Sequence, residues 1–123
     1  MSFCTVINCM DGRTQIPVIR YLQDKFGVDY VDSITEPGPN LILAEGKRTD
    51  LINSILARLE ISMGAHNSVG IAVVGHHGCA GNPAPQDVQI AHIKKAIQFL
   101  RQHYKAEIIG LWVDSKWEVE EIA

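Results

Sequence analysis

The sequence predicts an α/β protein with a mostly parallel central sheet of four to five strands flanked by helices. Short apolar segments rich in β-branched residues alternate with longer segments whose apolar residues recur at helical spacing. This alternation implies parallel strands joined by right-handed crossovers. The chain of 123 residues is long enough for one hydrophobic core and shows no linker or internal repeat, so we expect a single domain spanning residues 1–123.

The first segments predict a strand, a helix and a second strand. Residues 3–8 are mostly β-branched and apolar, and are expected to form a buried strand. Thr14 is a candidate cap for a helix that has Pro17 in its first turn. An apolar stripe follows at helical spacing, and Gly27 ends the helix. Residues 30–35 predict a short second strand.

The middle of the chain predicts one clear helix and one clear strand. Residues 36–40 hold two prolines, which exclude ladder hydrogen bonds, so we expect a turn or loop. Residues 41–46 are ambiguous. Residues 49–63 repeat apolar side chains on one face and predict a helix, with Gly64 as its stop. Residues 69–74 form an apolar run typical of a strand that is buried on both faces.

The last third predicts a long helix and two further strands. After a proline-containing connector, residues 86–104 form the helix and residues 107–113 a strand, while residues 117–122 add a short final strand. One apolar stripe is expected to bury the helix: Ile90, Ile93, Ile97, Leu100 and Tyr104.

Composition excludes several classes of function. With 46% hydrophobic and 20% charged residues, the chain is typical of a soluble globular protein. Its net charge of -3 gives no basic footprint, so we expect no nucleic-acid partner. No apolar run approaches the roughly 20 residues that span a bilayer, and the first residues lack the basic start of a secretory signal. Three cysteines are an odd number with no disulfide pattern, which favours reduced thiols in the cytoplasm.

Three side chains with metal-ligating chemistry are predicted to meet at one edge of the sheet. Cys9 follows the first strand, and His76 and Cys79 follow the third in a turn with glycine at every third position. The carboxyl ends of parallel strands share an edge, where ligands bind in open α/β sheets. Two thiolates and one imidazole suit zinc in tetrahedral geometry, and three protein ligands leave the fourth position open, as in catalytic sites.

Asp11 and Arg13 come directly after Cys9 and are predicted to act together. At a spacing of two residues in an extended turn, all three side chains point the same way. Arg13 is positioned to hold Asp11 ionised through a bidentate pair. Asp11 then either accepts a hydrogen bond from a zinc-bound hydroxide or occupies the fourth position itself, and the sequence leaves both open.

Simpler interpretations exist for each of these residues. Cys9 taken alone reads as a buried thiol at a strand end, and the Asp11–Arg13 pair as an ordinary turn salt bridge. His77 is an exposed neighbour of the site or a proton shuttle. The glycine-rich turn lacks the lysine of a phosphate-binding loop, although a phosphate-binding domain is a third possibility. The other histidines show no evident partners and are assigned to the surface: His66, His92 and His103.

Two motifs together resemble the β-class carbonic anhydrases. Residues 9–13 (Cys-Met-Asp-Gly-Arg) and 76–79 (His-His-Gly-Cys) match that family's Cys-x-Asp-x-Arg and His-x-x-Cys patterns. The resemblance implies a β-carbonic anhydrase-like fold with Zn²⁺ held by Cys9, His76 and Cys79. It also implies that Asp11 and Arg13 form the catalytic dyad. The implied reaction is reversible hydration of carbon dioxide to bicarbonate, with zinc-bound hydroxide as the nucleophile, in a homodimer or higher homo-oligomer.

The sequence departs from that family in three places. The N-terminal helical arm that usually embraces a dimer partner is not seen, so we expect a different or smaller interface. Residues 35–40 stand where the family usually has an Arg-Asn-Ala-Gly-like segment, and the role of residues 35–46 is unassigned. Ala80 rather than glycine follows Cys79. These changes favour two alternatives as well: a zinc-binding regulatory module without turnover, or a hydrolase of carbonyl sulfide or carbon disulfide.

Overall fold

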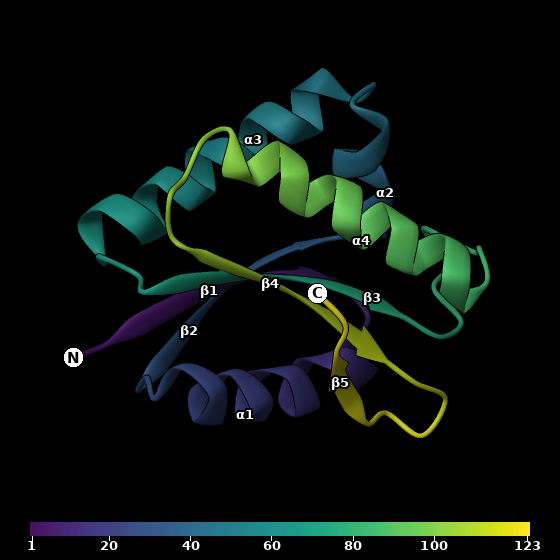
Figure 1. The fold of residues 1–123 in the computed structure, drawn as a ribbon, viewed down its shortest axis with the longest axis horizontal. Coiled ribbons are helices and arrows are strands. Elements are labelled where there is room, and N and C mark those ends of the chain that lie inside the picture. The colour runs from purple at the N-terminus through teal and green to yellow at the C-terminus, as the bar shows by residue number, and fades with distance from the viewer.

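A five-stranded sheet with helices on both faces forms the centre of the computed structural model, which describes residues 1–123 (Figure 1). The strands are β1 (Phe3–Cys9), β2 (Tyr30–Glu36), β3 (Gly70–His76), β4 (Glu107–Val113) and β5 (Val119–Glu121). They lie in the order β2-β1-β3-β4-β5. The first four are parallel, and β5 pairs antiparallel with β4. The predicted fold class is therefore confirmed.

The helices divide between the two faces of the sheet. Helix α1 (Gln15–Phe26) covers one face, and α2 (Pro39–Glu45), α3 (Thr49–Glu60) and α4 (Gln86–Arg101) cover the other (Figure 1). Side chains of β1 alternate between these faces: Cys4 and Val6 belong to the apolar cluster on the α1 side, and Ile7 to the cluster on the α3–α4 side. Both clusters are built mainly from β-branched and leucine side chains, which explains why the strands read as continuous apolar runs.

Residues 36–46 differ from the prediction. Residues 39–45 form helix α2, although residues 36–40 were expected in a loop and residues 41–46 were ambiguous. Gly38 adopts a left-handed conformation with φ of 65° and turns the chain into Pro39, whose fixed φ suits the first turn of a helix. Two prolines therefore mark the start of a helix here as well as the end of a strand.

The other helices differ from the prediction in smaller ways. Residues 49–60 are α-helical, but the segment Ile61–Ala65 continues as a π-helical turn. Thr14 precedes α1 as expected, yet its hydroxyl donates to the Asp11 carbonyl at 2.8 Å instead of capping the helix. Helix α4 ends at Arg101, three residues before the predicted end.

A polar cluster holds the π-helical turn against the amino ends of the strands. The buried hydroxyls of Thr5 and Ser62 contact each other, and Ser62 donates to Asp32 at 2.6 Å. Nδ1 of His66 lies 2.6 Å from the same carboxylate, and its ring stacks on Phe3. His66 was expected to lack a partner, which is wrong, because β2 places Asp32 beside it.

No helix is both long enough and apolar enough to cross a lipid bilayer.

Candidate metal centre

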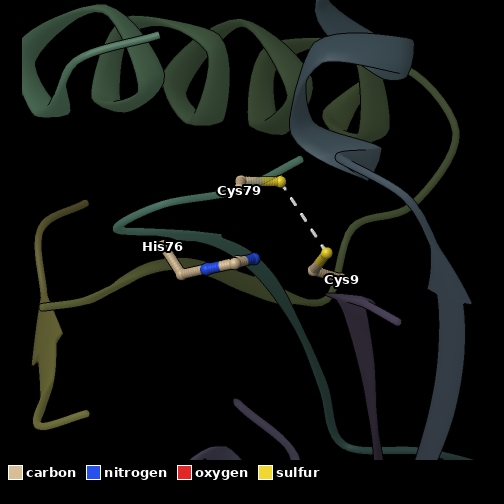
Figure 2. Close-up of side chains that lie close together, drawn as sticks. All are labelled: Cys9, His76 and Cys79. Carbon is tan, nitrogen blue, oxygen red and sulfur yellow. Dashed lines mark hydrogen bonds between the residues drawn. The ribbon is translucent and has the colours of Figure 1, made fainter. Parts of the chain in front are cut away.

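Cys9, His76 and Cys79 converge where two neighbouring strands end (Figure 2). Cys9 is the last residue of β1, His76 is the last residue of β3, and Cys79 lies three residues further along the loop. The strands β1 and β3 are adjacent, and the order of the sheet reverses between them. Open α/β sheets bind ligands at such a reversal point, outside the carboxyl ends of the strands.

The three side chains have the spacing of a tetrahedral metal site. Their ligand atoms lie within 4.8 Å of one another, and the two sulfurs are 3.8 Å apart. Zinc–sulfur bonds of about 2.3 Å at a tetrahedral angle separate two sulfurs by about 3.8 Å. All three residues are buried. The donor set and its spacing therefore fit a zinc ion without rearrangement of the backbone.

The backbone fixes which ring nitrogen of His76 faces the two sulfurs. Nδ1 lies 2.8 Å from the carbonyl oxygen of His77, which only accepts, so Nδ1 carries the hydrogen. Nε2 then presents a lone pair toward the cysteines, as the orientation of the ring in Figure 2 indicates. Nε2 is buried and has no hydrogen-bond partner. Metal-ligating histidines have this arrangement, with one nitrogen bonded to the protein and the other left for the metal.

The two thiols share a hydrogen bond that shifts their pKa values in opposite directions. The contact with Cys79 lowers the pKa of Cys9, while the same contact, together with burial, raises the pKa of Cys79. For His76, burial lowers the pKa but interactions with the Cys9 sulfur and the His77 carbonyl outweigh it, so the pKa is raised. The pair of thiols therefore releases one proton readily and keeps the second, which a divalent cation would have to displace.

Asp11 and Arg13 form the predicted bidentate pair beside this group. Nε and an Nη of Arg13 donate to the two carboxylate oxygens of Asp11 at 3.1 and 2.7 Å. These hydrogen bonds lower the pKa of Asp11 to about 2. The guanidinium also lies 4.3 Å over the ring of Trp117, which adds a cation–π contact. The Asp11 carboxylate is not one of the atoms that cluster with the two sulfurs and Nε2.

The loop that carries Cys79 touches the loop after β2 through the backbone. A Cβ on Gly81 would lie 2.4 Å from the carbonyl carbon of Pro37, and a Cβ on Gly38 would lie 2.7 Å from the carbonyl carbon of Gly81. Only glycine allows this approach. The interaction with the Gly38 backbone also contributes to the lowered pKa of Cys9. The atypical segment after β2 therefore forms one wall of the cluster.

Gln89 of α4 holds the loop that carries His76, and the sequence analysis missed it. Its Oε1 accepts from the His76 N–H at 3.3 Å, and its Nε2 donates to the His76 carbonyl at 2.9 Å. Nε2 also lies 3.1 Å from the Asn82 carbonyl and 3.2 Å from that of Ala84. The predicted apolar stripe of this helix included Ile90, but in the structure Gln89 is the buried residue and Ile90 is half-buried. A polar residue four positions before Ile93 was the available signal.

Three more side chains, those of Asn82, Asn40 and His92, extend this polar network. The Asn82 amide donates to Asn40 at 3.3 Å, and its nitrogen lies 3.1 Å from Nδ1 of His92. Asn40 in turn donates to Oε1 of Gln89 at 3.3 Å. His92 was expected to lack a partner, which is wrong. The network ties α2, α4 and the ligand loop together.

His77 is not one of the side chains that cluster. It is exposed, and its backbone N–H donates to the Val113 carbonyl at 2.9 Å. It lines a surface pocket of about 480 Å³ with Trp112 and Asp114, and neither Cys9 nor Cys79 lines that pocket. The structure therefore places His77 beside the metal centre and not in it.

Comparisons with known proteins agree with this architecture. The model of a protein family described as "Putative carbonic anhydrase" matches residues 1–123. No curated protein matches the chain. Among solved structures, a carbonic anhydrase from Glaciozyma antarctica is 18% identical with a TM-score of 0.58, covering 97% of this chain and 81% of its own.

Two other fungal structures share the fold. The β-carbonic anhydrase CafA of Aspergillus fumigatus is 12% identical with a TM-score of 0.56, covering 98% of this chain and 74% of its own. One of two tetrameric β-carbonic anhydrases from Sordaria macrospora is 13% identical with a TM-score of 0.56, covering 99% and 80%. At these identities the similarity shows a common fold.

Proposed function

This chain belongs to the carbonic anhydrase family whose model it matches, and from that premise we propose that it catalyses the zinc-dependent, reversible hydration of carbon dioxide to bicarbonate. The convergence of Cys9, His76 and Cys79 carries the proposal, because two sulfurs and one imidazole nitrogen lie within 4.8 Å of one another. Bound zinc would lower the pKa of water to about 7 and so supply hydroxide at neutral pH. Three protein ligands leave a position for that chemistry.

We assign Asp11 and Arg13 to orientation of the attacking water. A carboxylate with a pKa of about 2 is a weak base at neutral pH, but it is a constant hydrogen-bond acceptor. Arg13 keeps Asp11 ionised and fixes the plane of its carboxylate through two hydrogen bonds. Asp11 therefore accepts a hydrogen bond from the attacking water. This hydrogen bond directs a lone pair of the water oxygen toward carbon dioxide. Its place outside the cluster favours this role over metal ligation.

Metal analysis combined with a hydration assay tests the proposal. Zinc-loaded protein should contain about one zinc per chain by mass spectrometry and should accelerate carbon dioxide hydration in stopped flow. Cys9→Ser should lose both properties. Cys4→Ser is the matched control, since Cys4 is also a buried cysteine of β1 but lies on the opposite face, among the apolar residues under α1. Hydration activity that survives Cys9→Ser would contradict the proposal.

Zinc binding without hydration would favour the alternatives. Full zinc occupancy with no activity on carbon dioxide, carbonyl sulfide or carbon disulfide would indicate a regulatory zinc-binding protein. Activity on either sulfur compound alone would indicate a related hydrolase. The altered wall formed by Pro37 and Gly38 is the feature that favours a substrate change, because it replaces a segment typical of the β-class.

We also propose a cytoplasmic homo-oligomer. All three cysteines are free, as expected in a reducing compartment. One of the similar structures is described as tetrameric, and β2 leaves one edge of the sheet without a neighbouring strand. Light scattering after size exclusion tests the assembly, and a mass of one chain would contradict it.

A further inference from the structure

The turn between β4 and β5 carries a tryptophan where its backbone favours glycine. The Trp117 N–H donates to the Asp114 carbonyl at 3.0 Å and closes a four-residue turn, and the Asp114 N–H donates to the Glu118 carbonyl at 3.0 Å. Trp117 has a φ of 62°, a left-handed conformation that is rare for bulky side chains. Glycine is the favoured fourth residue of the commonest β-turns. The backbone therefore disfavours tryptophan here, which points to a role for its side chain.

The indole of Trp117 lies beside the candidate metal centre. Cζ of Arg13 is 4.3 Å from the centroid of its ring, and the centroid of the His76 ring is 6.3 Å away. The indole is half-buried against the apolar cluster on the α1 side of the sheet. The strand β5 and the turn before it lie on that side (Figure 1). The turn therefore brings its tryptophan to the residues that follow β1.

The Asp11–Arg13 pair has few side-chain contacts with the rest of the fold. The Arg13 side chain is 56% exposed, and its guanidinium donates only to Asp11. Every hydrogen bond that the Asp11 carboxylate accepts comes from Arg13. The two side chains are therefore held to each other. The contact with Trp117 is the one that orients them relative to another part of the fold.

We propose that Trp117 is a positioning residue for the hydration reaction; this inference rests on the proposed function, in which Asp11 orients the attacking water. The indole fixes the plane of the Arg13 guanidinium, because a planar guanidinium stacks on an aromatic face. The two hydrogen bonds from Arg13 then set the plane of the Asp11 carboxylate beside the metal centre. Among aromatic side chains tryptophan attracts a cation most strongly, which agrees with its presence at a position that favours glycine.

Nitrogen-15 NMR of the purified protein, before and after zinc is added, provides a readout that does not depend on turnover. The Nε–H group of Arg13 gives a signal that is identified by its loss in Arg13→Lys. A ring over the guanidinium shifts this signal, and its heteronuclear nuclear Overhauser effect reports how ordered the side chain is on the picosecond to nanosecond timescale.

The variants separate stacking from packing. Trp117→Leu removes the ring and Trp117→Phe keeps an aromatic face, while both keep a Cβ at the left-handed position and so leave the backbone strain as it is. Tyr21→Leu is the matched control, because Tyr21 packs against the same apolar cluster but is not stacked on Arg13. If Trp117→Leu folds poorly, Trp117→Gly removes the ring with a residue that suits the turn.

In Trp117→Leu we expect the Arg13 signal to lose its ring-induced shift and its Overhauser effect to fall toward that of the exposed Arg101. In the zinc-loaded protein kcat for hydration should fall about two- to fivefold, the ratio that an exposed cation–π contact supports. KM should change by less than about twofold, because the indole acts on the dyad and not on substrate binding. Trp117→Phe should lie between Trp117→Leu and the wild type, and Tyr21→Leu should match the wild type in both the Arg13 signal and kcat.

Four outcomes would overturn the inference. An unchanged Arg13 signal in Trp117→Leu would show that the indole does not hold the guanidinium, and a mobile Arg13 with unchanged kcat would show that its plane does not affect the reaction. Equal losses of kcat in Trp117→Leu and Tyr21→Leu would show that Trp117 only supports the fold. Zinc-loaded wild type without hydration activity would overturn the proposed function, and this inference with it, whatever the NMR spectra show.

Discussion

Gly81→Ala should destabilise the protein and weaken its metal centre at the same time. The added Cβ would lie 2.4 Å and 2.5 Å from the carbonyl carbon and oxygen of Pro37, and 2.8 Å from the amide nitrogen of Gly38. These atoms belong to the backbone, so no side chain can rotate away. Forced overpacking of this kind costs about 1–3 kcal/mol.

The size of the effect follows from the length of the chain. An unfolding entropy of about 2.1 cal/mol/K per residue gives about 0.26 kcal/mol/K for 123 residues, so the unfolding temperature should fall by about 4–12 °C. Cys79 lies two residues before Gly81, so displacement of this loop from Pro37 and Gly38 should also shift the Cys79 sulfur relative to Cys9. We expect zinc affinity, measured by competition with a chromophoric chelator, to fall at least about tenfold.

Gly12→Ala is the matched control, because a Cβ there meets nothing within 4 Å and the residue lies in the turn after Cys9. It should unfold within about 2 °C of the wild type and keep its zinc affinity. If Gly81→Ala behaves like Gly12→Ala in calorimetry and in the chelator assay, the contact between the two loops does not hold the cluster together.

Three further changes test other parts of the structure. Gln89→Leu should lower the free energy of unfolding by at least about 2 kcal/mol in urea, because several backbone carbonyls lose their donor, whereas the exposed Gln98→Leu on the same helix should not. Arg13→Gln should let the pKa of Asp11 rise from about 2 toward about 4 in an NMR titration; the contact stabilises the fold above pH 4 and is lost as the pH falls toward 2, so an unchanged pKa would contradict the assignment. Burial raises the pKa of the Cys4 thiol to about 11, so its contribution to stability is complete below pH 9 and is lost as the pH rises toward 11; Cys4→Val should therefore lose less stability over that range in denaturant titrations.

The sheet and the three converging side chains were predictable because their signals are local and their geometry is general. A strand buried on both faces reads as an unbroken apolar run, and the turn after it begins where the polar and glycine residues begin. Parallel strands end at one edge of the sheet, so the motifs of Cys9 and of His76 with Cys79 had to meet if both strands were assigned correctly. The match to the family model agrees with this reasoning.

What the sequence did not reveal depends on which residues meet in space. Helical periodicity tolerates Gln89 or Ile90 in the buried stripe, and only the packing of α4 against the ligand loop selects the glutamine. Pro39 suits both a loop and the first turn of a helix, and the left-handed Gly38 decides between them. The partner of His66 lies on a strand 34 residues away, and the partner of His92 lies in the loop before its helix; neither contact follows from a local sequence pattern.

The two apolar clusters that support the sheet determine how the protein should respond when metal is scarce in the cell. They fill both sides of the sheet with buried side chains, and none of the three candidate ligands belongs to either cluster. Small zinc fingers unfold when a chelator removes their ion, because the ion replaces a core. This chain has its own core, so under the proposed function zinc starvation should leave folded protein that takes up zinc again when zinc returns, without new synthesis.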